Sequence, residues 1–145
     1  MKVTFHPENS DQTVIAESTA TRVGKAPAGA HAASGSWRIS KVKQSENGLL
    51  TTYKGGVDGL TMSQPTGQSY TAKLDGKDYP VKGSYTYNSV SLRRVGDRTI
   101  EETDKRDGKV VGVSTMTVAS DGKTMTVVST NKLTGRTTTS VAQKQ

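Results

Sequence analysis

Residues 107–127 read DGKVVGVSTMTVASDGKTMTV, and this stretch decides the expected fold. After the first Asp-Gly pair, Val110, Met116 and Val118 fall on one face of an extended chain, while Val111 falls on the other. This two-residue period is typical of a β-strand. Asp-Gly pairs supply the positive φ angles that tight hairpin turns require. The stretch therefore predicts two antiparallel strands joined by a short turn.

The same pattern extends along the chain. Asp-Gly pairs also occur at Asp58 and Asp75, and from Gly96 onward turn signals recur about every 11 to 14 residues, the rhythm of a β-meander. No segment shows the apolar stripe of an amphipathic helix. Strands are expected at residues 2–6, 13–23, 36–45, 49–54, 58–64, 69–74, 79–82, 89–95, 98–105, 109–119, 123–131 and 136–143.

These strands predict an all-β protein. We expect an antiparallel up-and-down meander that closes into a calycin-like barrel of about 8–10 strands, because closure removes the unpaired edges of a sheet. A two-sheet sandwich is the alternative.

The 145 residues are expected to form one domain with an added N-terminal hairpin. Residues 1–23 are the hairpin, residues 24–35 a flexible linker rich in Ala and Gly, and residues 36–145 the main meander. Because an isolated hairpin is marginally stable in water, this one must bury its apolar side chains. It either completes the barrel of its own chain, which we favour, or adds to a second chain in a strand-swapped homodimer.

Composition excludes several kinds of chemistry. The chain has no Cys and only two His, which excludes disulfides, thiolate catalysis, Cys-ligated metals and a multi-His site. We expect no metal, no cofactor and, since no run of about 18 apolar residues occurs, no membrane span. The net charge of +7 favours anionic partners. The basic residues are scattered, so nucleic acid is the least favoured of these partners.

Gly35-Ser36-Trp37 resembles the Gly-x-Trp motif that opens the first barrel strand of lipocalins and other calycins. The resemblance implies that Trp37 closes one end of the barrel, under a basic side chain from the last strand. Arg136 is the expected partner through a cation–π contact, and Lys144 is the alternative. An ordinary core position for Trp37 would explain the motif equally well.

A second resemblance covers residues 70–145. The segments LDGKDYPV (74–81), SVSLRRV (89–95), DGKVV (107–111) and SDGKTMTV (120–127) resemble small bacterial proteins, often secreted, that are described as lipocalin-like. This resemblance implies a fold and a periplasmic or secreted location, but no activity. No charged segment followed by an apolar one precedes the first expected strand, so we expect no signal peptide in this chain.

Few residues are suited to catalysis. Glu102 and Asp104 share one face of an expected strand, about 6.5–7 Å apart by strand rise, a spacing near that of the two carboxyls of inverting glycosidases. Cross-strand ion pairing within a charged hairpin is the favoured explanation of these residues. His6 and His31 are weaker candidates, since one ends the first strand and the other lies in the linker. The sequence leaves open whether the protein is an enzyme.

Tyrosines and basic residues cluster in the middle of the chain. They are suited to line a barrel mouth that binds an aromatic or anionic ligand. Packing of the core and rim, or stacking on nucleic-acid bases, are the alternatives. The expected ligand-binding residues are Tyr70, Tyr79, Tyr85, Tyr87, Arg93 and Arg94.

These observations favour a non-enzymatic protein that binds a small hydrophobic or amphipathic anionic ligand in a barrel cavity. The second hypothesis is a small metal-independent hydrolase or isomerase that uses the carboxylates or His in the same cavity. The third is binding of a polyanion or nucleic acid by the basic surface.

Overall fold

The computed structural model describes residues 2–5, 14–24, 28–45, 49–56 and 58–145, and its secondary-structure elements are all β-strands. The first three are β1 (Lys2–Phe5), β2 (Val14–Arg22) and β3 (Trp37–Gln44). The others are β4 (Thr52–Gly55), β5 (Gly59–Ser63), β6 (Ser69–Lys73), β7 (Asp75–Lys82), β8 (Ser89–Gly96), β9 (Thr99–Arg106), β10 (Lys109–Val118), β11 (Thr124–Asn131) and β12 (Thr137–Gln143). In the part of the chain that the structure describes, no helix is long and apolar enough to cross a membrane.

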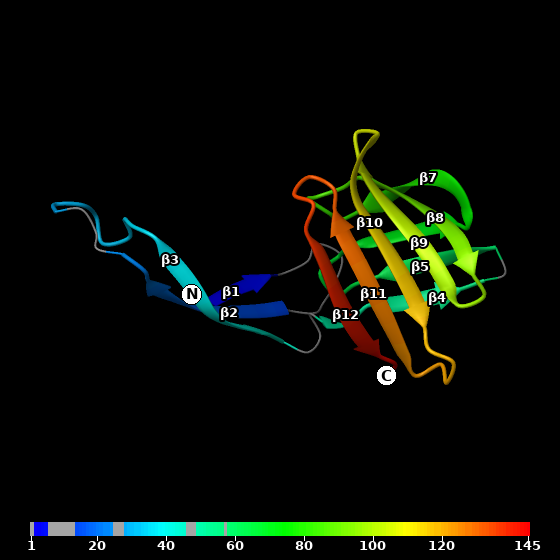
Figure 1. Ribbon diagram of the computed structural model, residues 1–145, viewed down its shortest axis with the longest axis horizontal. Helices are drawn as coiled ribbons and strands as arrows, with labels where there is room; N and C mark the ends of the chain where they lie inside the picture. Colours follow the sequence, from blue (N-terminus) through cyan, green and yellow to red (C-terminus); the bar gives the residue numbers. More distant parts are fainter. Residues whose placement is uncertain (1, 6–13, 25–27, 46–48, 57) are drawn as a thin grey trace.

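Strands β4 to β12 form one antiparallel sheet in which each strand pairs with its neighbour in sequence. The sheet curls into a half-barrel (Figure 1), which confirms the expected all-β meander. The two outermost strands of this sheet are β4 and β12, and they are not paired with each other. The curl therefore produces a concave face without a continuous ring of hydrogen bonds.

The Asp-Gly pairs act in two ways. Asp107 and Gly108 both have positive φ angles, of 51° and 77°, and they connect β9 to β10 in the tight turn that the sequence predicts. Asp75-Gly76 instead lies at the start of β7, where the register against β8 shifts between Asp75 and Asp78. The sequence predicts a turn at Asp75-Gly76, whereas the structure has a bulge there. Like a tight turn, this bulge needs a positive φ angle, which Gly76 adopts at 74°.

The core lies on the concave face of the half-barrel. Val90 and Leu92 on β8 have no exposed surface, and Ala72 on β6 is almost fully buried. Met62 and Tyr70 complete this buried cluster. Because inward residues alternate with outward ones along each strand, the same alternation turns Glu102 and Asp104 of β9 toward this face.

The first three strands form a separate sheet, which we call the arm (β1, β2 and β3). Residues 1–23 include the expected hairpin, in which β1 pairs with β2. The expected strand at 36–45, however, pairs with β2 as β3 and not with the main meander. Residues 24–35 consequently connect two strands of the arm and do not link the hairpin to the meander.

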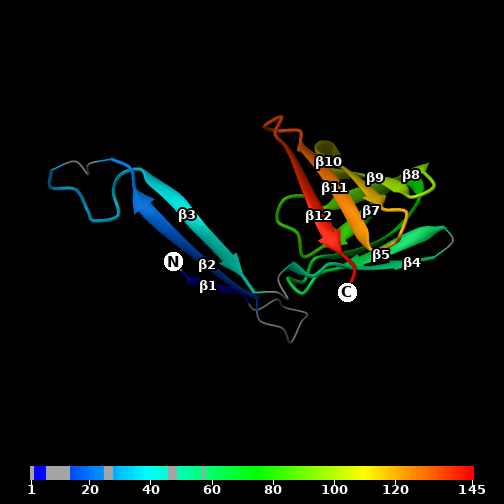
Figure 2. The ribbon, with the colours of Figure 1, turned by 60° about the horizontal axis from the view of Figure 1, so that its bottom comes forward.

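Strand length explains this correction. β2 and β3 are nine and eight residues long, and they form seven residue pairs, from Ala16 opposite Gln44 to Arg22 opposite Trp37. The favoured completion of the barrel by residues 1–23 of the same chain is not what the structure shows, since no described strand of the arm is hydrogen-bonded to the half-barrel. In Figures 1 and 2 the arm projects away from it.

Candidate functional site

Glu102 and Asp104 lie side by side on the concave face, as their spacing predicts. The register places Glu102 opposite Leu92 and Asp104 opposite Val90, so both carboxyls border the fully buried core residues of β8. Their side chains are hydrogen-bonding partners of each other. The carboxyls are therefore close enough to share a proton.

Tyrosines surround this carboxyl pair. The Tyr70 hydroxyl, on β6, donates a hydrogen bond to Glu102 Oε2. The negative charges of Glu102 and Asp104 act on Tyr53 and on Tyr87, whose hydroxyl accepts a hydrogen bond from Gln68 Nε2. The Oδ1 atom of Asp104 is buried and has no hydrogen-bond partner among the described residues.

Burial sets the protonation state of the pair. Loss of solvation, opposed by the Tyr70 hydrogen bond and aided by the neighbouring Asp104, raises the pKa of Glu102 to about 7. Burial also raises the pKa of Asp104, to about 6. Two carboxyls in contact share one proton more readily than they both ionise, because two negative charges at this distance repel each other. Below neutral pH at least one of them is therefore an acid able to donate a proton.

Gly112 makes room for Asp104. A Cβ atom at Gly112 would lie 2.8 Å from Asp104 Oδ2 and 3.5 Å from Asp104 Cβ. Real Cβ atoms essentially never approach another atom within 3.0 Å. A side chain at this position of β10 would therefore push the Asp104 carboxyl out of its present position.

Gly112→Ala is expected to destabilise the protein by about 1–3 kcal/mol, the usual cost of overpacking. The added methyl must displace the Asp104 carboxyl from Glu102. The measurement is urea denaturation of the single variant and of Gly112→Ala combined with Asp104→Ala. The cost of Gly112→Ala should largely vanish in the Asp104→Ala background, and an equal cost in both backgrounds would show that the methyl clashes elsewhere.

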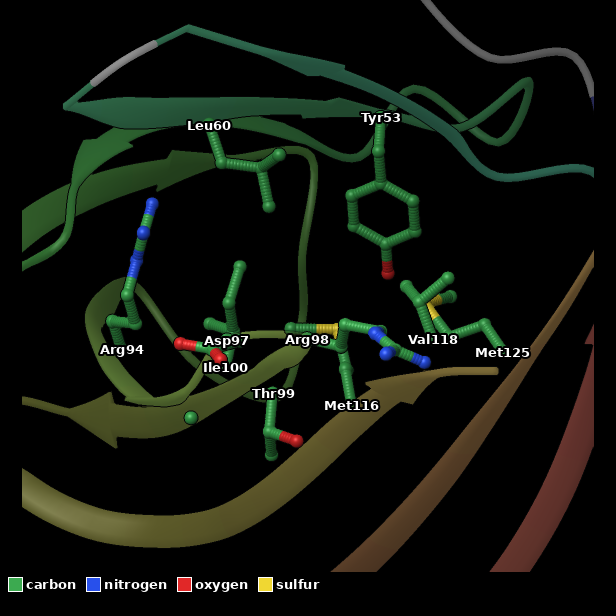
Figure 3. Close-up of a pocket in the computed structure, with 11 residues that line it drawn as sticks. Tyr53, Leu60, Arg94, Asp97, Arg98, Thr99, Ile100, Met116, Val118 and Met125 are labelled. Atoms are coloured by element: carbon green, nitrogen blue, oxygen red, sulfur yellow. The ribbon is translucent and has the colours of Figure 1, made fainter. Parts of the chain in front are cut away.

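A cavity of about 240 Å³, which we call the end pocket, opens at one end of the half-barrel (Figure 3). Six strands and the turn between β8 and β9 contribute to it. The residues that line it are Tyr53, Leu60, Arg94, Gly96, Asp97, Arg98, Thr99, Ile100, Met116, Val118 and Met125. Most of these are apolar, and the two methionines supply flexible side chains that adapt to an occupant.

Two guanidinium groups and one phenol give the end pocket its polarity. In Figure 3 Arg94 and Arg98 lie on different sides of the pocket, and the Tyr53 hydroxyl points into it from β4. Asp97 also lines the pocket, yet neither arginine forms an ion pair of 4 Å or less with a described carboxylate. Burial and the charges of Glu102 and Asp104 raise the pKa of Tyr53 to about 12, so its hydroxyl is a neutral hydrogen-bond donor.

The end pocket and the carboxyl pair are neighbours on one concave surface. Ile100 lines the pocket and precedes Glu102 by two residues on the same face of β9, about 6.5–7 Å along the strand. Tyr53 also lines the pocket, and the negative charges of both carboxyls raise its pKa. A molecule in the end pocket would thus lie close to a titrating acid pair.

The structure separates the predicted ligand-binding residues. Tyr70 is buried beneath the carboxyl pair, and Arg94 lines the end pocket. Tyr85 is 94% exposed, and Arg93 points outward to form an ion pair with Glu101 at 3.5 Å. Tyr79 donates a hydrogen bond to Asp75 Oδ2 at 3.0 Å, away from the pocket, and Tyr87 belongs to the group around the carboxyls. The six residues therefore do not form one barrel mouth.

Trp37 does not close the barrel. It lies on β3 of the arm with 46% of its surface exposed, and the guanidinium carbon of Arg22 is 4.3 Å from the ring centroid. The partner is Arg22 because β2 and β3 place these two residues directly opposite each other. The expected partners Arg136 and Lys144 are on the half-barrel, where Arg136 closes the turn before β12 through a 2.9 Å backbone bond to Asn131.

His31 contributes nothing to this surface. His31 is exposed in the connection between β2 and β3, where its Nδ1 accepts a 3.1 Å hydrogen bond from the Ala33 backbone N–H. His6 lies outside the described residues. Among those residues no three His, Asp or Glu side chains gather in a way that could hold a metal ion.

Sequence reasoning missed Tyr53 and Arg98 as site residues. Tyr53 is distant in sequence from the tyrosine cluster, and Arg98 was considered only as the first residue of the expected strand 98–105. The alternation that placed Met116 and Val118 on one face was the available signal, because both residues line the end pocket. Comparison of the chain with protein-family models, curated proteins and solved structures finds no match.

Proposed function

We propose that this protein binds a small amphipathic anion in the end pocket. One observation carries the proposal: Arg94 and Arg98 line an apolar cavity, and neither is ion-paired with a described carboxylate. Guanidinium groups bind carboxylates and phosphates through two parallel hydrogen bonds. An anionic head held by an arginine, with its apolar body against the methionines, Leu60 and Ile100, would use both properties of the cavity.

The size of the cavity limits the ligand. Pockets that bind drug-sized molecules have volumes of about 300–1,000 Å³, and the end pocket has about 240 Å³. The occupant should therefore be smaller, such as a medium-chain fatty acid or an aromatic carboxylate. The neutral Tyr53 hydroxyl offers this occupant a further hydrogen bond.

We also keep the proposed relationship to calycins. The curled antiparallel meander supports it, because calycins hold their ligands inside a barrel of this kind. The position of Trp37 on the arm gives it no support.

Binding of 1-anilinonaphthalene-8-sulfonate, an aromatic anion with strong apolar character, tests the proposal. We expect one site per chain, displacement by octanoate and little dependence on salt, whereas binding to a basic surface would weaken steeply with ionic strength. Replacing Arg94 and Arg98 together with Gln should raise Kd at least about tenfold, since hydrogen bonds to charged groups contribute about 1.5–3 kcal/mol.

Arg93→Gln is the matched control. Arg93 is adjacent to Arg94 but points to the outer face, so its replacement should leave Kd unchanged. Equal Kd values for the wild type and the double variant, or an equal loss with Arg93→Gln, would show that the dye binds outside the end pocket.

A second candidate function is general acid–base catalysis at Glu102 and Asp104. The contact between two half-buried carboxyls favours it, since proton sharing prepares one group to donate and the other to accept. Turnover of a panel of chromogenic esters and glycosides would test it. Glu102→Gln should abolish any such turnover while leaving dye binding in place, and turnover that survives the substitution would exclude this pair as its source.

A further inference from the structure

The two sheets leave four free edges among the described strands, and these edges differ in composition. β1 and β4 are only four residues long, and β4 contains Lys54. β3 carries Arg38, Lys41 and Lys43. Short edge strands and edge lysines are the usual devices that prevent sheets from pairing with one another.

β12 has none of these devices. Its seven residues, TTTSVAQ, include no charge, no proline and no glycine, and all seven are exposed. One side of β12 is paired with β11, so the backbone N–H and C=O groups on its other side have no partner strand. This sequence is also rich in β-branched residues, which favour extended pairing.

Apolar side chains adjoin this open edge on the outer face. Val141 is 65% exposed and Val128 of the neighbouring strand is 38% exposed. Val128 lies opposite Thr139, which is two residues from Val141, so the two valines are diagonal neighbours on one face. An added strand beside β12 would cover both the unpaired backbone groups and Val141.

We propose that β12 pairs antiparallel with β12 of a second copy of this chain, which continues the nine-stranded sheet across a two-fold axis. Two identical strands satisfy such an axis, because each residue i of one copy meets a residue j of the other, and residue j of the first copy meets residue i of the second. A pairing centred on Ser140 places Val141 opposite the partner's Thr139 on the outer face. Within β12 this register opposes no like charges, and only beyond its ends does Arg136 meet the partner's Lys144. Self-pairing of β3 about Val42 would instead oppose Lys41 and Lys43 within the strand.

This interface is independent of the proposed ligand site. No residue of β12 lines the end pocket, and the carboxyl pair lies on β9. Dye binding and association of two chains can therefore succeed or fail separately.

Sedimentation velocity of the full chain at micromolar concentrations, combined with paired substitutions, is the test. The wild type should sediment as a dimer. Thr139→Lys with Val141→Lys places lysines directly opposite each other across the proposed pairing, and it should raise the dimer Kd at least about tenfold, that is by about 1.4 kcal/mol. Circular dichroism should show an unchanged β spectrum, because both positions are exposed.

Thr126→Lys with Val128→Lys is the control. It adds the same charge on the same face of the sheet, one strand away from the edge, and should change the dimer Kd much less. A monomeric wild type overturns the proposal, as does a dimer that both double variants weaken equally or that neither weakens.

A covalent probe gives independent evidence, because the chain contains no native cysteine. Ser140→Cys lies at the proposed two-fold axis and should form a disulfide-linked dimer under mild oxidation. Ser120→Cys, in the exposed turn between β10 and β11, should stay largely monomeric. Equal crosslinking of the two variants would mean random collision and would contradict the pairing of β12.

Discussion

Leu92→Ala is expected to lower the free energy of unfolding by about 2–5 kcal/mol, the range for truncating a buried leucine. Leu92 has no exposed surface and packs in the cluster formed by Met62, Tyr70, Ala72 and Val90. The chain has few large apolar residues, with 31% hydrophobic content, so neighbouring side chains have little capacity to fill the space left. Thermal unfolding should show a midpoint lower by at least about 6 °C.

Leu133→Ala provides the comparison. Leu133 is 75% exposed in the turn between β11 and β12, so its truncation should change stability by less than about 0.5 kcal/mol. Similar costs for the two leucines would mean that the concave face is not the core of the protein.

Glu102→Gln is expected to stabilise the protein by about 2–3 kcal/mol at pH 8. Burial raises the pKa of Glu102 from 4.5 to about 7, so the folded state disfavours the ionised form that the unfolded chain adopts freely. Each pKa unit corresponds to about 1.4 kcal/mol. The neutral amide of glutamine avoids this penalty and still offers an oxygen to the Tyr70 hydroxyl.

The sign of this effect fixes its pH dependence. For an acid with a raised pKa in the folded state, the unfolded state loses its proton first, and the contribution of that acid to stability falls as pH rises. For Glu102 the decline lies between about pH 4.5 and pH 7. Urea denaturation at pH 4 and pH 8 should show near-equal stability of wild type and variant at pH 4 and a more stable variant at pH 8.

Glu101→Gln is the matched control, because Glu101 is the adjacent residue on the outer face. Its carboxylate forms a partly exposed ion pair with Arg93, worth about 0–1 kcal/mol. Its replacement should slightly lower the free energy of unfolding, and it should not raise that free energy at pH 8. A Glu102→Gln variant that is less stable than wild type at pH 8 would mean that the ionised carboxylate stabilises the fold.

Local sequence patterns were sufficient to locate the strands of the half-barrel. The stretch at 109–118 alternates with a two-residue period, and Asp107-Gly108 allows the positive φ angles of the turn before it. Both properties depend on a residue and its immediate neighbours. The same alternation placed Glu102 and Asp104 on one face, which the structure confirms.

The partners of each side chain depended on tertiary structure. Tyr70 and Glu102 are 32 residues apart and meet because the sheet curls β6 toward β9. Tyr53 and Arg98 reach one pocket for the same reason. Trp37 faces Arg22 and not Arg136 because residues 37–44 pair with β2 over seven residue pairs and do not pair with the meander.

The sequence by itself thus determined where this chain extends, where it turns and which residues alternate. These properties follow from steric preferences over two to four residues. The curl of the sheet, the allocation of β3 to the arm and the meeting of Glu102 with Asp104 and Tyr70 were decided only in the folded protein. Register between distant strands and the burial of side chains between them are collective properties, set when many weak contacts form together.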